Sequence, residues 1–318
     1  MMHRVLWLIL SGLLVLGVFG ACTPAATPTP IPTPTQVKAQ YPMTVTDMMG
    51  RSVTVAQRPS RVVTISPTAT EMLYRVGGIA VGRDTSSKFP PEAQALPTVG
   101  GAYTPSVEAI VALQPDLIII EALSQGRLVA SLEKAGKPVL AVRASSLDDV
   151  VQSLALVGKV IDRQGPATQA GGEVQARVKA AAGTVTAPRK VLIFISDADR
   201  NIYAAKPESY VGSIATLLKL TNGAAGLPDS GPYPGFTLFS AEQAVSSQPD
   251  IIFTISPAPA PAPRLSTVLP QVPGYSGLAA VKDGRVQELN PDLFLQAPGP
   301  RLADAVEEMG RLVGLMTK

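Results

Sequence analysis

The chain has 318 residues, of which 46% are hydrophobic and 16% are charged, and its formal net charge is +3 at pH 7. Its lysines and arginines do not form runs and are not interleaved with aromatic residues, which argues against a nucleic-acid-binding surface. The single histidine, His3, and the single cysteine, Cys22, lie near the N-terminus, so the rest of the chain lacks the base of Ser-His-Asp and Cys-His catalysis and the usual zinc ligands.

Residues 1–21 have the features of a secretory signal peptide. Arg4 precedes an apolar run, residues 5–19, and two small residues then lead into Cys22. This order is typical of an exported chain, and the run is too short to span a membrane. The segment that ends in Cys22 resembles a lipobox, although Phe19 stands where leucine or valine is usual. The resemblance implies that the Cys22 thiol is lipidated and that the protein is extracytoplasmic and anchored to the cell membrane through lipid.

Residues 22–40 alternate threonine with proline over most of their length and are predicted to form a linker. Such a sequence cannot continue a helix or a sheet and favours the extended polyproline II conformation. At about 3.1 Å per residue, the segment can separate a folded unit from the membrane by roughly 50 Å. The linker therefore suits an anchored protein whose folded part works at a distance from the lipid surface.

The remaining residues are sufficient for two domains. Short apolar runs typical of buried strands alternate with segments of helical periodicity, which favours sheets flanked by helices. We predict an α/β fold with two similar lobes, residues 41–164 and 187–318, each with a central, mostly parallel sheet, joined by a long connecting helix at residues 165–186. The predicted strands are residues 61–66, 117–120, 138–142, 190–196, 251–255 and 285–289.

An internal repeat supports the two-lobe prediction. Residues 106–119 and 240–253 match in their glutamate, glutamine, proline and aspartate positions at an offset of 134 residues. In each segment a serine suits the helix N-cap, a glutamate follows in the positively charged first turn, and a proline ends the helix before a strand. Glu108 and Glu242 therefore occupy equivalent positions, one in each lobe.

The connecting segment has a helical pattern of its own. Pro166 suits a first helical turn, and Val174, Val178 and Ala181 share one face. Two neighbouring glycines weaken the helix by about 1 kcal/mol each. A rigid helix between the lobes would restrict their closure, unlike a hinge made of a loop.

These features resemble the helical-backbone (class III) periplasmic binding proteins, which serve ABC importers for ferric siderophores, haem and vitamin B12. The resemblance covers about residues 41–315 and rests on five stretches in their order. They are residues 46–55, 61–71, 99–110, 115–118 and 299–302. The resemblance implies a monomer without enzymatic activity that holds a small-molecule ligand between its lobes and docks onto an ABC permease dimer. In this family one glutamate on each lobe makes that contact, and the matching positions are Glu108 and Glu242.

The ligand site is expected in the cleft between the lobes, because ligands of α/β proteins bind beyond the carboxyl ends of parallel strands. Aromatic rings there suit a large planar ligand, and cationic side chains suit carboxylates or a ferric catecholate. Glu71, by contrast, has with Thr68 the spacing of a capping box and is predicted to be structural. The candidate ligand-binding residues are Ser66, Pro67, Lys88, Phe89, Tyr103, Arg200, Tyr203, Tyr233, Phe236 and Phe294.

Absent residue types narrow the ligand class. Without histidine, the mature chain is a poor match for histidine-ligated haem or for direct capture of zinc or manganese. Trp7, in the signal peptide, is the only tryptophan, so the tryptophans of cobalamin-type clefts are also missing. No EF-hand loop is present, and neither a resident metal nor a cofactor is expected. We favour a ferric siderophore or a corrinoid as the ligand, with haem as the alternative.

Two other function classes stay open. A sensor lipoprotein that does not take part in transport would share the same sequence features. An extracytoplasmic α/β enzyme would need a catalytic base other than histidine, and the chain has no G-x-S-x-G motif.

Overall fold

The computed structural model describes residues 40–316 except residues 135, 198, 259 and 260. The predicted signal peptide, the predicted lipidation site Cys22 and the predicted linker up to residue 39 lie outside the described residues. None of the helices in the described part of the chain is long and apolar enough to cross a membrane.

The N-lobe, which we define as residues 40–163, contains a four-stranded sheet in the order β4-β3-β7-β8. All neighbouring strands in this sheet run parallel. Antiparallel pairs of short strands, β1 with β2 and β5 with β6, lie outside it. The N-lobe elements are β1 Met43–Thr46, β2 Ser52–Val55, β3 Val62–Thr64, α1 Pro67–Arg75, β4 Ala80–Gly82, η1 Pro91–Ala95, β5 Gly100–Gly101, β6 Thr104–Pro105, α2 Val107–Ala112, β7 Leu117–Glu121, α3 Ala122–Gln125, η2 Gly126–Leu128, α4 Val129–Glu133, β8 Val139–Val142 and α5 Leu147–Val160.

The C-lobe, which we define as residues 184–316, contains a six-stranded sheet in the order β12-β10-β9-β13-β14, with β11 also paired to β9. Strands β9, β11, β13 and β14 form parallel pairs, whereas β10 runs antiparallel to both β9 and β12. The predicted α/β class with mostly parallel sheets is confirmed. The C-lobe elements are β9 Lys190–Ser196, β10 Ile202–Ala205, α7 Tyr210–Leu217, β11 Thr221–Asn222, β12 Phe236–Leu238, α8 Ala241–Ser247, β13 Ile251–Ile255, α9 Leu265–Val268, η3 Leu269–Gln271, α10 Ala279–Lys282, β14 Val286–Leu289, α11 Pro291–Phe294 and α12 Leu302–Met316.

The two repeated segments have the same local structure. Ser106 and Ser240 are the N-caps of α2 and α8, and each hydroxyl accepts a hydrogen bond from the backbone N–H three residues on. Asp116 accepts a hydrogen bond from the N–H of the residue before β3 (2.9 Å), and Asp250 accepts one from the first residue of β9 (2.8 Å). Asp116 thus ties the start of β3 to the start of β7, and Asp250 ties the start of β9 to the start of β13.

Each central strand sends alternate side chains into two cores, as a strand buried on both faces must. In β7, Leu117 and Ile119 belong to a large core, whereas Ile118 and Ile120 belong to a second core within the N-lobe. Phe194 of β9 belongs to a third core within the C-lobe. The large core is continuous through both lobes, since it includes apolar residues of both sheets and of α5, α6 and α12.

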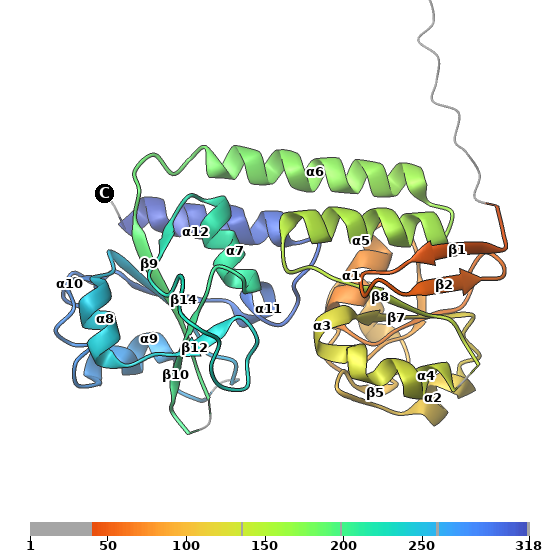
Figure 1. The fold of residues 1–318 in the computed structure, drawn as a ribbon, viewed down its shortest axis with the longest axis horizontal. Helices are drawn as coiled ribbons and strands as arrows, with labels where there is room; N and C mark the ends of the chain where they lie inside the picture. The colour runs from red at the N-terminus through yellow and green to blue at the C-terminus, as the bar shows by residue number, and fades with distance from the viewer. Residues whose placement is uncertain (1–39, 135, 198, 259–260, 317–318) are drawn as a thin grey trace, which may run out of the picture. The chain divides into compact units, whose positions relative to one another are not determined.

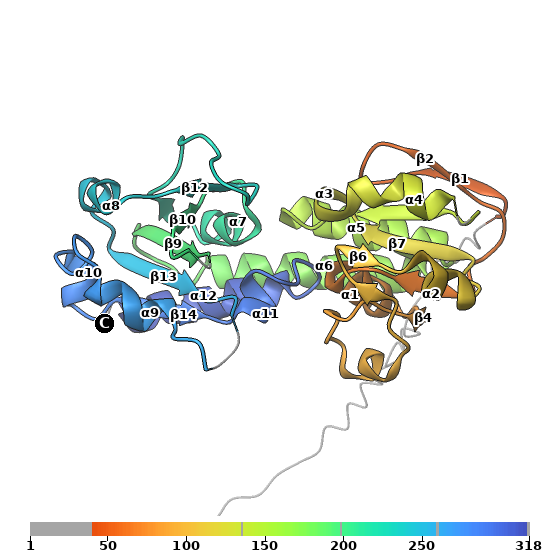
Figure 2. The same ribbon diagram turned by 90° about the horizontal axis from the view of Figure 1, so that it is seen from below.

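Helix α6, Gln164–Ala182, occupies most of the segment predicted to connect the lobes. It contacts α1 and α5 of the N-lobe and α12 of the C-lobe (Figure 1, Figure 2). Glu173 of α6 pairs with Arg75 of α1. One turn later, Arg177 pairs with Asp304 and Glu307 of α12 at 2.7 and 2.6 Å. A single helix is therefore bonded to both lobes.

Candidate functional site

A cavity of about 220 Å³ lies between the two lobes. The N-lobe contributes the first turn of α1 and the loop after β4, and the C-lobe contributes the segment that links β14 to α12. Charged side chains of both signs and one aromatic ring line the cavity, a lining that suits a ligand with both polar and apolar groups. Its lining residues are Pro67, Glu71, Ser86, Lys88, Phe89, Asn290, Asp292, Gln296, Ala297 and Arg301.

Ser66 and Pro67 are placed where β3 ends and α1 begins. The Ser66 hydroxyl caps α1 by accepting a hydrogen bond from the N–H of Ala69 at 3.0 Å, and Pro67 fills the first helical position, where its missing N–H costs nothing. Both side chains are buried. Pro67 lines the cavity, whereas Ser66 shapes the site by fixing the start of the helix.

The loop that carries Lys88 and Phe89 is held by buried polar groups. Asp84 accepts hydrogen bonds from the backbone of Ser86 (2.7 Å) and from the hydroxyl of Ser87, which also bonds Thr70 of α1 (2.9 Å). These bonds fix the loop to α1, so the two exposed side chains that follow project from a rigid support.

Arg301 is the centre of the contact between the lobes. Its guanidinium forms a two-pronged ion pair with Glu71 of α1, at 2.6 Å (Nη2–Oε1) and 2.9 Å (Nε–Oε2), and also bonds the carbonyl oxygen of Asp292 at 3.2 Å. The same guanidinium lies 4.6 Å from the centre of the Phe89 ring, a cation–π contact. These bonds use Nε and Nη2, and among the described residues no hydrogen bond of Nη1 is found.

The predicted role of Glu71 in a capping box is wrong. Helix α1 begins two residues earlier than that pattern requires, because its N-cap is Ser66 and not Thr68. Glu71 instead bonds Arg301, 230 residues away in the sequence, and its side chain is only 2% exposed. Burial raises the pKa of Glu71 above its usual value, and the hydrogen bonds and charge of Arg301 offset part of this rise.

Lys88 makes a second, weaker link across the cavity. Its ammonium group lies 3.5 Å from a carboxylate oxygen of Asp292 in the C-lobe. Both side chains are about half exposed or more, so this ion pair contributes little to stability and can exchange for a ligand group at small cost. Lys88 and Arg301 therefore give the cavity two cationic groups. Lys88 is held by one weak ion pair, whereas Arg301 is held by two hydrogen bonds to Glu71.

Three exposed apolar side chains lie beyond the ends of the N-lobe strands. Phe89 follows β4, Tyr103 lies between β5 and β6, and Leu123 follows β7; they are 42%, 59% and 64% exposed. Gln125 holds this edge together, since its amide donates to the carbonyl oxygens of Ile65 and of the residue before Tyr103. We call Phe89, Tyr103 and Leu123 the apolar edge. Leu123 was missed in the sequence because nothing in its pattern distinguishes an exposed leucine from a core one.

The aromatic candidates of the C-lobe pack on one another. The Tyr203 and Tyr233 rings meet edge to face at 5.3 Å, and the Tyr233 and Phe236 rings lie 6.3 Å apart. Tyr203 and Phe236 are buried, and a side chain at Gly231 would collide with the Tyr203 ring. This cluster supports the β10–β12 edge of the sheet and leaves Tyr233 as its most accessible ring.

The last two ligand candidates lie apart from the cavity lining. Arg200 is exposed between β9 and β10, with a positive φ of 65°. Phe294 is 1% exposed and belongs to the large core, so it presents no surface to a ligand in this structure. The sequence around Phe294 predicted an exposed loop, but the residue ends α11 and its ring lies in the large core.

Glu108 and Glu242 are both exposed in the first turns of α2 and α8. The Ser240 hydroxyl lowers the pKa of Glu242, which keeps this carboxylate charged. Three residues after each glutamate, on the same helical face, stands an exposed valine, Val111 or Val245. The two lobes therefore present the same combination of groups to solvent.

The described residues contain no group of three or more histidine, cysteine, aspartate or glutamate side chains that could hold a metal ion. The charged groups of the cavity are instead engaged with one another across the lobes. The interactions that these side chains can offer to a ligand are ion pairs, hydrogen bonds and ring contacts.

Comparison with known proteins agrees with this arrangement. The sequence model of the family described as "Periplasmic binding protein" matches residues 62–293. The chain is 27% identical over 283 residues to the uncharacterized ABC transporter substrate-binding lipoprotein YvrC of Bacillus subtilis, an alignment that covers 86% of each protein. It is 28% identical over 281 residues to the cobalamin-binding protein of Halobacterium salinarum, covering 86% of this chain and 73% of that protein.

Among solved structures, the fold is similar to that of the periplasmic heme-binding protein RhuT from Roseiflexus sp. RS-1 in its apo form. The TM-score is 0.70 and the sequence identity 23%, over 81% of this chain and 99% of that one. At this identity the likeness concerns the fold.

Proposed function

Because this chain belongs to the periplasmic binding protein family, we propose that it is the extracytoplasmic substrate-binding lipoprotein of an ABC importer and that its ligand is a corrinoid. The observation that carries the proposal is the cavity between the lobes, in which Arg301 stacks on the ring of Phe89, a member of the apolar edge. The match to a cobalamin-binding protein over 86% of the chain supports the corrinoid over the other ligand classes.

A corrinoid is much larger than the cavity of about 220 Å³, so most of it would lie outside this space. The apolar edge provides surface for the flat ring system, and Arg301 Nη1 and Lys88 provide donors for its amide and phosphate oxygens. A ferric siderophore would use the same donors. Haem would need an axial ligand, and the exposed phenol of Tyr103 on the apolar edge is a candidate for it.

In the proposed transport cycle, lipid on Cys22 keeps the protein at the membrane, and the linker allows it to reach the permease. Glu108 and Glu242 then dock onto basic side chains of the two permease subunits. Their equivalent places in the two lobes suit a partner made of two equal halves. No step of this cycle requires bond making or breaking by the protein.

The ligand assignment is tested by titrating the purified protein with cyanocobalamin, haem and a set of ferric hydroxamates and catecholates, followed by calorimetry. We expect one corrinoid per chain with a Kd of about 1 μM or tighter and no chemical change in the ligand. Tight binding of haem or of a ferric chelate with no binding of corrinoid would contradict the assignment. Lack of binding across the whole set would contradict the transport proposal itself.

The apolar edge is tested by removing its side chains. Phe89→Ala and Leu123→Ala are each expected to weaken corrinoid binding roughly 5- to 30-fold, because each removes about 1–2 kcal/mol of apolar contact. Leu315→Ala, which changes a similarly exposed leucine at the end of α12 (57% against 64% for Leu123), is the matched control and should bind normally. Unchanged affinity in both edge variants would place the ligand elsewhere.

A further inference from the structure

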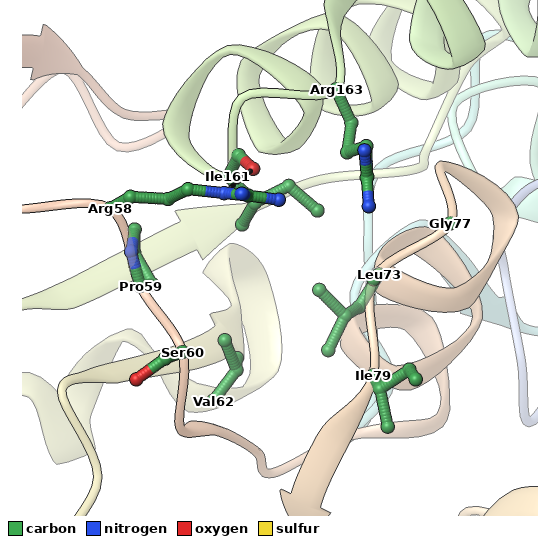
Figure 3. Close-up of a pocket in the computed structure, with 10 residues that line it drawn as sticks. Arg58, Pro59, Ser60, Val62, Leu73, Gly77, Ile79, Ile161 and Arg163 are labelled. Atoms are coloured by element: carbon green, nitrogen blue, oxygen red, sulfur yellow. Dashed lines mark hydrogen bonds between the residues drawn. The ribbon is translucent and has the colours of Figure 1, made fainter. Parts of the chain in front are cut away.

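The N-lobe carries a second cavity, of about 340 Å³, that does not belong to the cleft between the lobes. Three segments form it: residues 58–62 before and at the start of β3, the turn after α1, and the short connection between α5 and α6 (Figure 3). Its lining includes two arginines and several apolar side chains, and none of these residues takes part in the site described above.

Two guanidinium groups point into the mouth of this cavity. Figure 3 shows the side chains of Arg58 and Arg163 reaching toward the same opening from different segments. Arg58 donates from Nε to the carbonyl oxygen of Ile161 at 3.1 Å, which positions its remaining nitrogens. Within the described part of the chain, the Arg163 guanidinium has no side-chain hydrogen bond or ion pair. Asp162 is the neighbouring carboxylate, and with both arginines it leaves a net positive charge.

Below and beside the arginines the cavity is apolar. Val62 and Leu73 form its buried floor, and Ile79 stands at its rim. Ile79 is 71% exposed, the largest exposed fraction among the large hydrophobic side chains described as exposed. Paired arginines bind phosphate oxygens well, and an isoleucine beside them suits the apolar part of the same molecule. The cavity therefore fits a ligand with an anionic phosphate next to an acyl or glycerol portion.

The cavity also lies where the folded part of the chain begins. Tyr41 follows the predicted linker directly, and its hydroxyl donates to the carbonyl oxygen of Val160 at 2.7 Å, next to the cavity residue Ile161. The charges of Asp162 and Arg58 both act on the Tyr41 hydroxyl. If lipid on Cys22 holds the chain at the membrane, this is the part of the fold that lies closest to the lipid along the chain.

We propose that this cavity binds the headgroup of an anionic phospholipid, with Arg58 and Arg163 on the phosphate and Ile79 against the acyl boundary. The proposal rests on the lipid anchor of the proposed function. Binding of a headgroup would orient the anchored protein on the bilayer, in addition to the nonspecific attraction of basic residues to an anionic surface. The ligand cleft and the docking glutamates lie outside the cavity and stay available.

The test uses the lipidated chain purified from membranes and placed in nanodiscs of phosphatidylcholine alone or mixed with phosphatidylglycerol. Hydrogen exchange measured by mass spectrometry should show slower exchange in residues 56–62, 77–82 and 160–166 only in the discs with phosphatidylglycerol. This protection should be lost in Arg58→Gln/Arg163→Gln and reduced in Ile79→Ser. The matched control, Lys219→Gln/Lys282→Gln, removes the same charge from exposed positions of the C-lobe and should keep the protection.

Equal protection in both kinds of disc, or protection that survives in the double arginine variant, would overturn the proposal. Inorganic phosphate and soluble dihexanoyl phosphatidylglycerol form separate arms. Full protection by phosphate alone would identify a site for small anions and overturn the membrane assignment. The intact mass of the purified chain reports the acylation of Cys22 independently, so a missing anchor is distinguished from a cavity that does not bind lipid. Unchanged exchange in β9 and β13 verifies that each variant is folded.

Discussion

Ligand uptake by cells that carry Glu108→Arg/Glu242→Arg is expected to fall to the level of cells without the protein. Both carboxylates are exposed at equivalent positions of the two lobes, and reversal replaces attraction to a basic partner by repulsion. The purified variant should bind the ligand with an affinity within about twofold of the original, because neither side chain lines the cavity between the lobes. Uptake of radiolabelled cobalamin and calorimetry of the purified protein measure the two effects separately.

A first-turn carboxylate also stabilises its own helix, so a control must separate this role from docking. Asp148→Arg is suitable, because Asp148 is likewise exposed in the first turn of a helix, α5. It should lose a similar small amount of stability and transport normally. Each single reversal should reduce uptake less than the double reversal. Normal uptake in the double variant would show that these glutamates do not carry the docking.

Arg301→Met is expected to lower the free energy of unfolding by about 3–5 kcal/mol, the usual cost of leaving one member of a buried ion pair alone. The partner that remains, Glu71, is 2% exposed, and its two hydrogen bonds to Arg301 would be lost. Urea unfolding at neutral pH measures the change. The variant should also bind the ligand more weakly, since Arg301 lines the cavity.

The loss of unfolding free energy in Arg301→Met should be larger at high pH than at low pH. Burial already raises the pKa of Glu71, and removal of the nearby positive charge raises it further. A raised pKa in the folded state means that the folded state holds the proton more tightly than the unfolded state. Stability is therefore regained as the pH falls through that pKa, and the difference from the original protein should be largest near about pH 8 and smaller near about pH 5.

Two controls belong to this experiment. Arg311→Met removes an arginine of α12, the helix that follows Arg301, whose partner Glu308 is more exposed than Glu71. This variant should unfold at nearly the original urea concentration. Glu71→Leu/Arg301→Met removes both charges and should be more stable than Arg301→Met, because no buried charge is left unpaired. If Arg301→Met is as stable as the original protein, the Glu71–Arg301 ion pair does not contribute to the free energy of unfolding.

Much of the fold could be predicted because its signals are local. The six predicted strands, the serine N-caps and the helix between the lobes follow from apolar runs, capping residues and periodicity within short segments. The C-lobe edge formed by β10 and β12 was not predicted. Tyr203 and Phe236 on those strands suggested a ligand site, but their contacts with each other decide their burial, and a sequence does not display such contacts.

The candidate site was only partly accessible from the sequence. Lys88, Phe89 and Pro67 were predicted and do line the cavity, because they follow strands whose carboxyl ends could be recognised. Arg301 was seen only as part of a family-like stretch, since its partner Glu71 lies 230 residues away. An ion pair between residues so far apart in the sequence depends on how the two lobes pack together, and a local sequence pattern cannot predict it.

The core that runs through both lobes has a consequence for how the two halves of the repeat evolved. Helix α6 packs on α1 and α5 of the N-lobe and on α12 of the C-lobe, so part of the apolar surface of each half is covered only when this helix is in place. The halves should therefore unfold in one cooperative transition. A substitution that loosens one lobe lowers the stability available to the other, so natural selection acts on the two halves as a single inherited unit.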